Sequence, residues 1–273
     1  MKNLYKVLKA LFILAGLSAY SMGGAQDSLT FVQLCDPQLG MGGYQHDSVA
    51  LVQAVNQINE ISPDFVVICG DLVHFANDTS YSDLKSILSH LEVPCFAAPG
   101  NHDVENDPTV ESLEYYRNTI GDDYYMKDTL GYAFVFVNST LWTAPLDTET
   151  DMQDEWLNEV MTGLSDEQGP VFVVAHHPLF LKTSDEETPN SPISLEKRTE
   201  LLTLFSQSGV VGYLAGHTHT TLIYQFDDIQ LVCGATTSRN FDGKPLGFRL
   251  WNVSDSTATH EFVPLVVQDL ESF

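Results

Sequence analysis

The chain of 273 residues carries 37 acidic but only 12 basic residues, so its formal net charge is −25. Such a charge repels nucleic acid and anionic lipid, and we expect neither as a partner. A hydrophobic content of 44% is enough for one large core. No linker or internal repeat divides the chain, and we therefore predict a single domain.

The first 25 residues have the pattern of an export signal. Three lysines precede an apolar run over residues 10–19, and small residues follow up to Ala25. The run is too short to span a bilayer, although an uncleaved anchor is the alternative. We expect cleavage after Ala25, a mature domain over residues 26–273, and a periplasmic or secreted protein without a stable membrane span.

The first half of the predicted fold alternates strands with helices. Continuous apolar runs predict strands, and apolar residues at helical spacing predict helices. The strands are expected at residues 29–35, 65–69 and 93–98, and the helices at 48–61 and 82–91. This βαβαβ order implies a parallel sheet.

Beyond residue 100 the same rules predict further helices and strands. Helices are expected at residues 108–120, 151–164 and 193–205, and strands at 124–126, 132–137, 171–175 and 210–215. The strands at 124–126 and 132–137 form a pair around Gly131. The tail from Leu222 to Val267 consists of short strand segments separated by turns.

The four cysteines lie in or beside apolar, strand-like segments, at Cys35, Cys69, Cys95 and Cys233. Export would permit two disulfides, but no pair has C-x-x-C spacing. Because a small apolar thiol suits a core strand, we expect buried free thiols rather than disulfides.

Polar side chains follow the predicted strands at the points where these strands end. They are Asp36, Asp71, Asn101, His176 and His217. The carboxyl ends of parallel strands share one edge of a sheet, so we expect these side chains to meet there. Oxygen and imidazole ligands without thiolate suit Zn, Mn or Fe, and with nearby side chains such as His219 the six to seven ligands exceed the needs of one four-coordinate ion. We therefore expect two metal ions.

Each of these segments also has a purely structural interpretation. Asp36-Pro37 and Gly70-Asp71 are ordinary turn sequences, as is Pro99-Gly100-Asn101. The alternating histidines of Gly216-His217-Thr218-His219 are harder to explain, because both cannot be satisfied in a core. The conjunction of all these segments in this order favours a functional site.

These residues resemble the calcineurin-like metallophosphoesterases. The family pattern D-x-H, G-D, G-N-H-D/E, H and G-H-x-H appears here as D-P-Q, G-D, G-N-H-D, H-H-P and G-H-T-H. The likeness covers residues 30–262 and is greatest to the calcineurin-like phosphoesterase domain-containing branch of serine/threonine phosphatases. It implies a four-layer α/β/β/α sandwich with two divalent or trivalent metal ions at the sheet edge.

The resemblance also implies a role for each matching residue. Asp36 and His219 would hold the first metal, Asn101, His176 and His217 the second, and Asp71 would bridge the two. The departure is Gln38, which stands where many relatives have a ligand histidine. Because an amide oxygen is a poorer donor than imidazole, the first site would be weaker, more open or completed by water.

The expected reaction is attack by a hydroxide that bridges the two metals, with no protein nucleophile. His102 would protonate the leaving alkoxide, and Asp103 would orient the His102 imidazole. His74 and His177 are candidates for contact with the substrate. Arg198 and Arg239 are candidates for binding a phosphate oxygen, although surface ion pairs are equally compatible with them.

We expect an exported phosphomonoesterase that acts on a small phosphorylated substrate or a phosphoprotein. A phosphodiesterase with the same site is one alternative, and a non-catalytic, metal-stabilised binding protein is another. The ligands fit Mn, Fe and Zn equally, and the sequence leaves the oligomeric state open.

Overall fold

We analysed a computed structural model, which describes residues 28–164, 169–187, 192–254 and 257–266. The predicted export signal lies outside these residues. Within them, no helix has both the length and the apolar character needed to cross a membrane.

The first of two sheets contains the predicted parallel strands β1 (Leu29–Leu34), β2 (Phe65–Cys69) and β3 (Cys95–Ala98). Two strands from the end of the chain, β10 (Gly247–Ser254) and β11 (Thr257–Pro264), extend this sheet on the side of β1. Both are antiparallel to their neighbours. The carboxyl ends of β1, β2 and β3 therefore lie at one edge, as the sequence predicts.

The second sheet has the order β4 (Tyr125–Thr129), β5 (Tyr132–Phe136), β6 (Val171–Val174), β7 (Val210–Ala215), β9 (Ile229–Cys233) and β8 (Leu222–Phe226). Strands β5, β6, β7 and β9 are parallel to one another, whereas the two outermost strands are antiparallel to their neighbours. This sheet also brings the ends of its parallel strands to a common edge.

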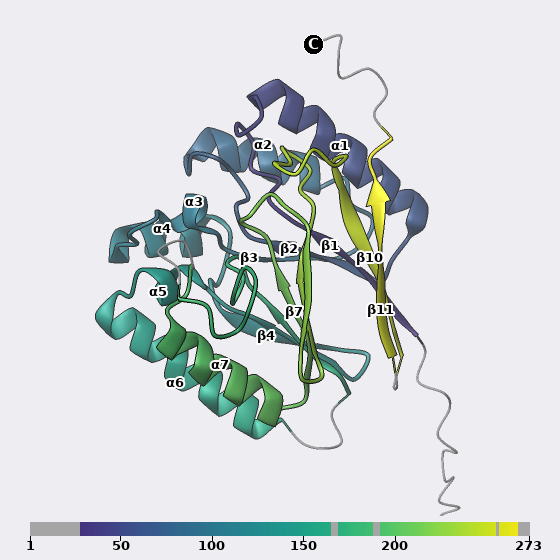
Figure 1. Ribbon diagram of the computed structural model, residues 1–273. Coiled ribbons are helices and arrows are strands. Elements are labelled where there is room, and N and C mark those ends of the chain that lie inside the picture. Colours follow the sequence, from purple (N-terminus) through teal and green to yellow (C-terminus); the bar gives the residue numbers. More distant parts are fainter. Residues whose placement is uncertain (1–27, 165–168, 188–191, 255–256, 267–273) are drawn as a thin grey trace, which may run out of the picture.

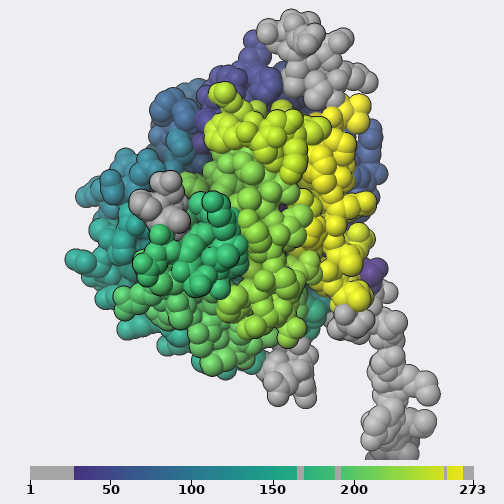
Figure 2. All heavy atoms as spheres, viewed as in Figure 1, coloured from purple at the N-terminus to yellow at the C-terminus, as the bar shows by residue number. Residues whose placement is uncertain are grey.

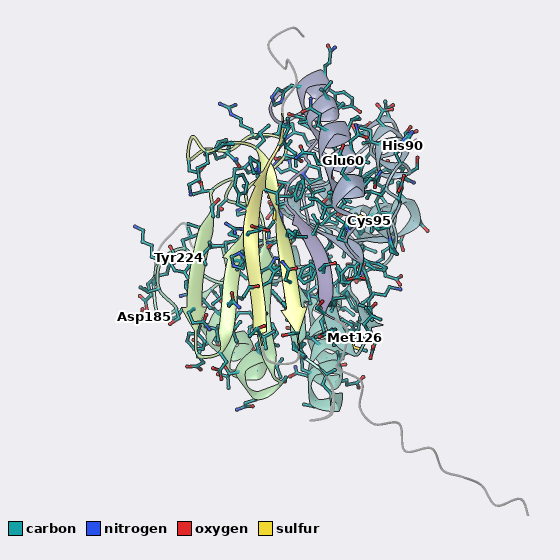
Figure 3. The ribbon with its side chains drawn as sticks, turned by 90° about the vertical axis from the view of Figure 1, so that its right-hand side faces the viewer. Glu60, His90, Cys95, Met126, Asp185 and Tyr224 are labelled. Carbon is teal, nitrogen blue, oxygen red and sulfur yellow. The ribbon has the colours of Figure 1, made fainter. Side chains whose placement is uncertain are left out.

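Helices cover the outer face of each sheet, which gives four layers (Figure 1). Helices α1 (Tyr44–Ile61), α2 (Asp78–Leu88) and α4 (Val110–Thr119) pack on the first sheet, and α6 (Asp147–Gly163) and α7 (Leu195–Gln207) pack on the second. Two short helices that the sequence did not predict are α3 (Asn101–Val104) and α5 (Thr140–Thr143). Figure 3 shows His90, just beyond α2, and Tyr224 of β8 on opposite sides of the molecule.

Aromatic side chains fill the space between the two sheets. The Phe31 ring of the first sheet stacks on Trp251, with 5.6 Å between the ring centroids, and meets the Phe172 ring of the second sheet edge-on at 5.3 Å. Phe172 in turn stacks on Phe134. Each such pair adds about 0.5–1.5 kcal/mol beyond the burial of its area. This inner core fixes the two sheets to each other, and it confirms the predicted sandwich.

Three helices begin earlier than their apolar periodicity predicts, among them α6, which begins at Asp147 rather than at residue 151. Helix α1 begins at Tyr44 rather than at residue 48, and α2 begins at Asp78 rather than at residue 82. In α2 the Asn77 side chain caps the helix by accepting a hydrogen bond from the backbone of Ser80. First turns are polar because they face solvent or caps, so apolar spacing does not reveal them.

All four cysteines are free thiols, which confirms that prediction. Cys35, Cys69 and Cys233 are buried, and Cys95 is half-buried.

Candidate metal centre

The structure brings the predicted strand-end residues together at the shared edge of the two sheets. The Asp36 carboxylate accepts a hydrogen bond from the backbone N–H of His217, 2.9 Å away, although the two residues are 181 positions apart. The His176 Nε2 atom lies 3.3 Å from Asp71 Oδ1. One site therefore contains residues from both sheets.

The backbone at this edge is strained. Five residues at this edge have a positive backbone φ angle, which residues other than glycine rarely adopt. They are Asp36, Gln38, Asp71, His217 and His219. Each such conformation costs on the order of 1–3 kcal/mol and is typical of functional sites. Two glycines are also required, because a Cβ atom on Gly100 or Gly216 would collide with the carboxylates of Asp71 or Asp36.

Asp36, Asp71 and His219 form the first group of potential metal ligands, with ligand atoms within 4.8 Å of one another. The Nδ1 atom of His219 donates to the Arg239 carbonyl at 2.5 Å, so the Nε2 atom keeps its lone pair, 3.7 Å from Asp36 Oδ1. Gln38 lies beside this group, and its Nε2 atom donates to Asp71. The buried Gln38 Oε1 atom has no hydrogen-bond partner among the residues that the structure describes.

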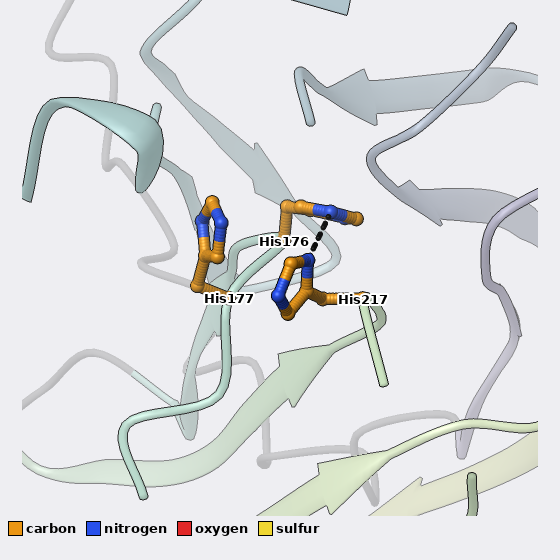
Figure 4. A group of neighbouring side chains, drawn as sticks. All are labelled: His176, His177 and His217. Atoms are coloured by element: carbon orange, nitrogen blue, oxygen red, sulfur yellow. Dashed lines mark hydrogen bonds between the residues drawn. The ribbon is translucent and has the colours of Figure 1, made fainter. Parts of the chain in front are cut away.

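Asn101, His176 and His217 form the second group. The Nδ1 atom of His176 donates to the Cys69 carbonyl, and the amide nitrogen of Asn101 donates to Asn106. The remaining atoms, His176 Nε2 and Asn101 Oδ1, are both acceptors and lie 2.9 Å apart. His217 Nδ1 lies 3.1 Å from each of them. Figure 4 shows the two histidine nitrogens facing each other.

Asp71 lies between the two groups, as a bridging ligand must. One carboxylate oxygen faces His176 of the second group, and the other accepts from Gln38 beside the first. The first oxygen also accepts the backbone N–H of His102 at 2.9 Å. The chain thus holds both carboxylate oxygens in fixed directions.

The electrostatics of both groups favour a bound cation. Burial, and then the charge of Asp71, raise the pKa of Asp36 well above its ordinary value. Burial also raises the pKa of Asp71, and it lowers the pKa of His176 and of His217 to about 3. The two histidines are therefore neutral and can offer a lone pair to a metal ion. The carboxylates lack a compensating positive charge. Converging lone pairs and the unpartnered Gln38 oxygen fit metal ions.

His102 lies beside this centre and is half-buried. Its Nδ1 atom donates to the His74 carbonyl at 2.9 Å, and the His74 ring stacks on it with 4.7 Å between centroids. The Nε2 atom is therefore the position at which His102 gains or loses a proton. The role of His102 as an acid stays a prediction.

Asp103 does not orient the His102 ring, and that expectation was wrong. Its buried carboxylate instead accepts the backbone N–H groups of Leu72 at 3.0 Å and Gly100 at 2.8 Å. Burial, followed by the charge of Asp71, raises the pKa of Asp103 to about 8, although these N–H groups lower it. Asp103 therefore joins the loop that carries Asp71 to the loop that carries Asn101.

Of the two arginines proposed to bind phosphate, only one is accessible. Arg198 is fully buried, and its guanidinium donates to the carbonyls of Leu179 and Glu186, so it supports the chain after β6 and cannot contact a substrate. Arg239 is exposed, and its backbone carbonyl accepts the hydrogen bond from His219 Nδ1. Its guanidinium lies over the Phe241 ring. Its loop, coloured lime in Figure 2, is joined to the first strand by a bond from Ser238 to the Asp36 carbonyl.

The sequence did not single out two residues that support the site. Asp47 accepts the backbone N–H groups of Gly40 and Gly42 at 2.9 Å, which fixes the loop after Gln38. Ser139 accepts the backbone N–H groups of His176 and His177. Ser139 lies beyond the end of β5, so the rule that found the other strand-end residues applies to it as well.

A family model described as calcineurin-like phosphoesterase matches residues 29–221, more than half of the chain. The chain belongs to the calcineurin-like phosphoesterase family. Members of this family use divalent metal ions, and this chain is accordingly a metal-dependent phosphoric ester hydrolase whose substrates are phosphorylated.

Curated relatives match most of the chain. The serine/threonine-protein phosphatase CPPED1 of Rattus norvegicus is 28% identical over 260 residues, which cover 86% of this chain and 83% of the relative. A probable cyclic nucleotide phosphodiesterase of Vesicomyosocius okutanii is 23% identical over 224 residues, 81% of this chain and 90% of the relative.

A solved structure has the same fold. A dimetal phosphatase from Danio rerio superimposes with a TM-score of 0.67 and 16% identity, covering 87% of this chain and 96% of that one. The predicted fold class is thus confirmed.

Proposed function

We propose that this calcineurin-like phosphoesterase is an exported enzyme that hydrolyses phosphate monoesters at a centre of two metal ions. The observation that carries the proposal is the position of Asp71 between two groups of acceptor atoms, of which the carboxylates of Asp36 and Asp71 lack a compensating positive charge. Asp36, Asp71 and His219 would hold one ion, with Gln38 Oε1 beside them. Asn101, His176 and His217 would hold the other.

The metal ions would acidify an attacking water and neutralise charge on the phosphoryl group. The chain itself supplies the proton for the leaving group. Because His74 holds the Nδ1 side of His102, the Nε2 side is available to protonate the departing alkoxide. Asp103 keeps the two loops that carry Asp71 and Asn101 in register.

The preference for monoesters is supported by the similarity to CPPED1, whose name describes a serine/threonine-protein phosphatase. Export is supported by the signal-like pattern of the first 25 residues. A small extracytoplasmic phosphate ester agrees best with this location and with a net charge of −25, because an acidic phosphoprotein surface would be repelled. Exposed Arg239 supplies local positive charge near the site.

The test is hydrolysis of p-nitrophenyl phosphate and of bis-p-nitrophenyl phosphate by the metal-loaded protein. We expect faster turnover of the monoester. Faster turnover of the diester would replace our proposal with a phosphodiesterase. Inactivity on both esters at full metal occupancy would indicate a binding protein.

A further inference from the structure

His177 differs from the neighbouring histidines in the position of its ring proton. The Ser139 Oγ atom contacts the backbone nitrogen of His176 at 3.1 Å, the backbone nitrogen of His177 at 2.9 Å and the His177 Nδ1 atom at 3.1 Å. A serine hydroxyl has one proton and two lone pairs. Backbone N–H groups can only donate, so they occupy both lone pairs. The hydroxyl proton is left for His177 Nδ1.

An imidazole whose Nδ1 atom accepts a hydrogen bond carries its own proton on Nε2. The opposite holds for His176, whose Nδ1 atom donates to the Cys69 carbonyl and whose Nε2 atom therefore has a free lone pair. Two consecutive histidines thus present opposite groups to the site. A metal ligand needs the lone pair, and His177 offers an N–H.

The N–H of His177 is held at the site without a partner. The side chain is only 3% exposed, and a bond from the Tyr213 hydroxyl to the His177 carbonyl fixes the backbone. Figure 4 shows the His177 ring beside that of His217, and 4.4 Å separates the two centroids. Within the described part of the chain, the Nε2 atom has no hydrogen-bond acceptor. An N–H without an acceptor in the protein is available to an entering anion, which would accept its hydrogen bond.

We propose that His177 is not a metal ligand and that its Nε2–H donates a hydrogen bond to a non-bridging phosphoryl oxygen of the substrate. Ser139 holds the ring in the tautomer that makes this possible. The inference rests on the proposed function for the identity of the anion. It gives His177 a role distinct from that of His176 and His217, with which it shares a cluster of ring nitrogens.

The first test compares His177→Phe and His177→Gln with the wild type, with inorganic phosphate as the probe. We expect both variants to retain full metal content by elemental analysis. The phosphate inhibition constant should rise about ten- to a hundredfold in His177→Phe, because a hydrogen bond to a charged group is lost. It should be partly restored in His177→Gln, whose amide keeps a donor. Loss of one metal equivalent in His177→Phe, or unchanged phosphate affinity, would overturn the proposal.

The control is His90→Phe, which changes an exposed histidine just beyond α2 (Figure 3). This variant should match the wild type in metal content and in phosphate inhibition. An equal loss of phosphate affinity in the control would contradict a specific role for His177.

The second test observes the tautomer directly, in two-bond ¹H–¹⁵N spectra of the zinc-loaded protein. We expect the proton on His177 Nε2 in the wild type and a mixture of tautomers in Ser139→Ala. A wild-type proton on Nδ1 would overturn the inference. The two proposals can fail separately, since inactivity of the wild type on both esters refutes the phosphoesterase, whereas the tautomer decides the role of His177 without any turnover.

Discussion

The Nε2 atom of His176 lies 2.9 Å from the Oδ1 atom of Asn101, and neither atom has a proton to share with the other. The proton-bearing atom of each side chain is engaged elsewhere, with the Cys69 carbonyl and with Asn106. Two acceptors at this distance repel each other unless a cation lies between them.

Metal binding should release protons, and the apparent metal affinity should rise with pH. Because burial raises the pKa of Asp36 and of Asp71, these carboxyl groups hold their protons up to a higher pH than ordinary carboxyl groups, and a metal ion must displace any proton that remains. The pKa of about 3 for His176 and His217 means that these histidines compete little through protonation near neutral pH. Calorimetry in buffers of different ionisation enthalpy measures the released protons. A binding enthalpy that does not depend on the buffer would contradict this prediction.

Replacement of Gln38 should change the affinity of only one of the two metal ions. Gln38→Leu removes the unpartnered Oε1 atom and the bond to Asp71, and we expect a loss of about ten- to a hundredfold in that affinity. Gln38→His should bind this ion more tightly than the wild type, because imidazole is the better donor. Metal titrations followed by calorimetry measure both. Gln225→Leu, an exposed change on β8, is the control, and an equal loss there would refute the assignment.

His102→Asn should lower kcat according to the leaving group. The asparagine amide can keep the bond to the His74 carbonyl but lacks the proton at Nε2. We expect a decrease of about 10²–10⁴-fold with an alkyl phosphate, whose alkoxide needs a proton. The decrease with p-nitrophenyl phosphate should be much smaller, because p-nitrophenolate leaves without one. Equal decreases for both substrates, at unchanged metal content, would show that His102 is not the acid.

Asp103→Asn should destabilise the fold without changing the orientation of the His102 ring. A neutral amide offers one oxygen to the backbone N–H groups of Leu72 and Gly100, and we expect a loss of about 1–3 kcal/mol in the free energy of unfolding in urea. The pH–rate profile of the remaining activity should keep its shape. An unchanged stability together with a shifted profile would instead support a role for Asp103 in orienting His102.

The meeting of the candidate metal ligands could be predicted from the sequence, because they follow the ends of strands and parallel strands end at a common edge. The direction of Asp103 could not be predicted from its position next to His102. Successive residues in a helical turn point about 100° apart, so two neighbours in α3 face different surroundings.

The prediction that Arg198 binds a phosphate oxygen was wrong, and the sequence itself contains the reason. It shares the buried face of α7 with Leu201, Leu202 and Phe205, at the spacing of one apolar stripe. The scarcity of basic residues made Arg198 a candidate for phosphate, whereas its helical position indicated burial. The role of Ser139 could not be predicted from the sequence. It depends on the contacts of the Ser139 hydroxyl with His177, which lies 38 positions away, and only the fold shows these contacts.

The central claim is that two metal ions bind at these residues and are needed for hydrolysis. It is tested most directly by titrating the metal-free protein with Mn, Fe or Zn while both bound metal and hydrolysis of p-nitrophenyl phosphate are followed. We predict saturation at two equivalents, with full activity only when the second has bound, and loss of both binding and activity in His176→Ala. Activity that is independent of metal, or saturation at a single equivalent with full activity, would contradict the account.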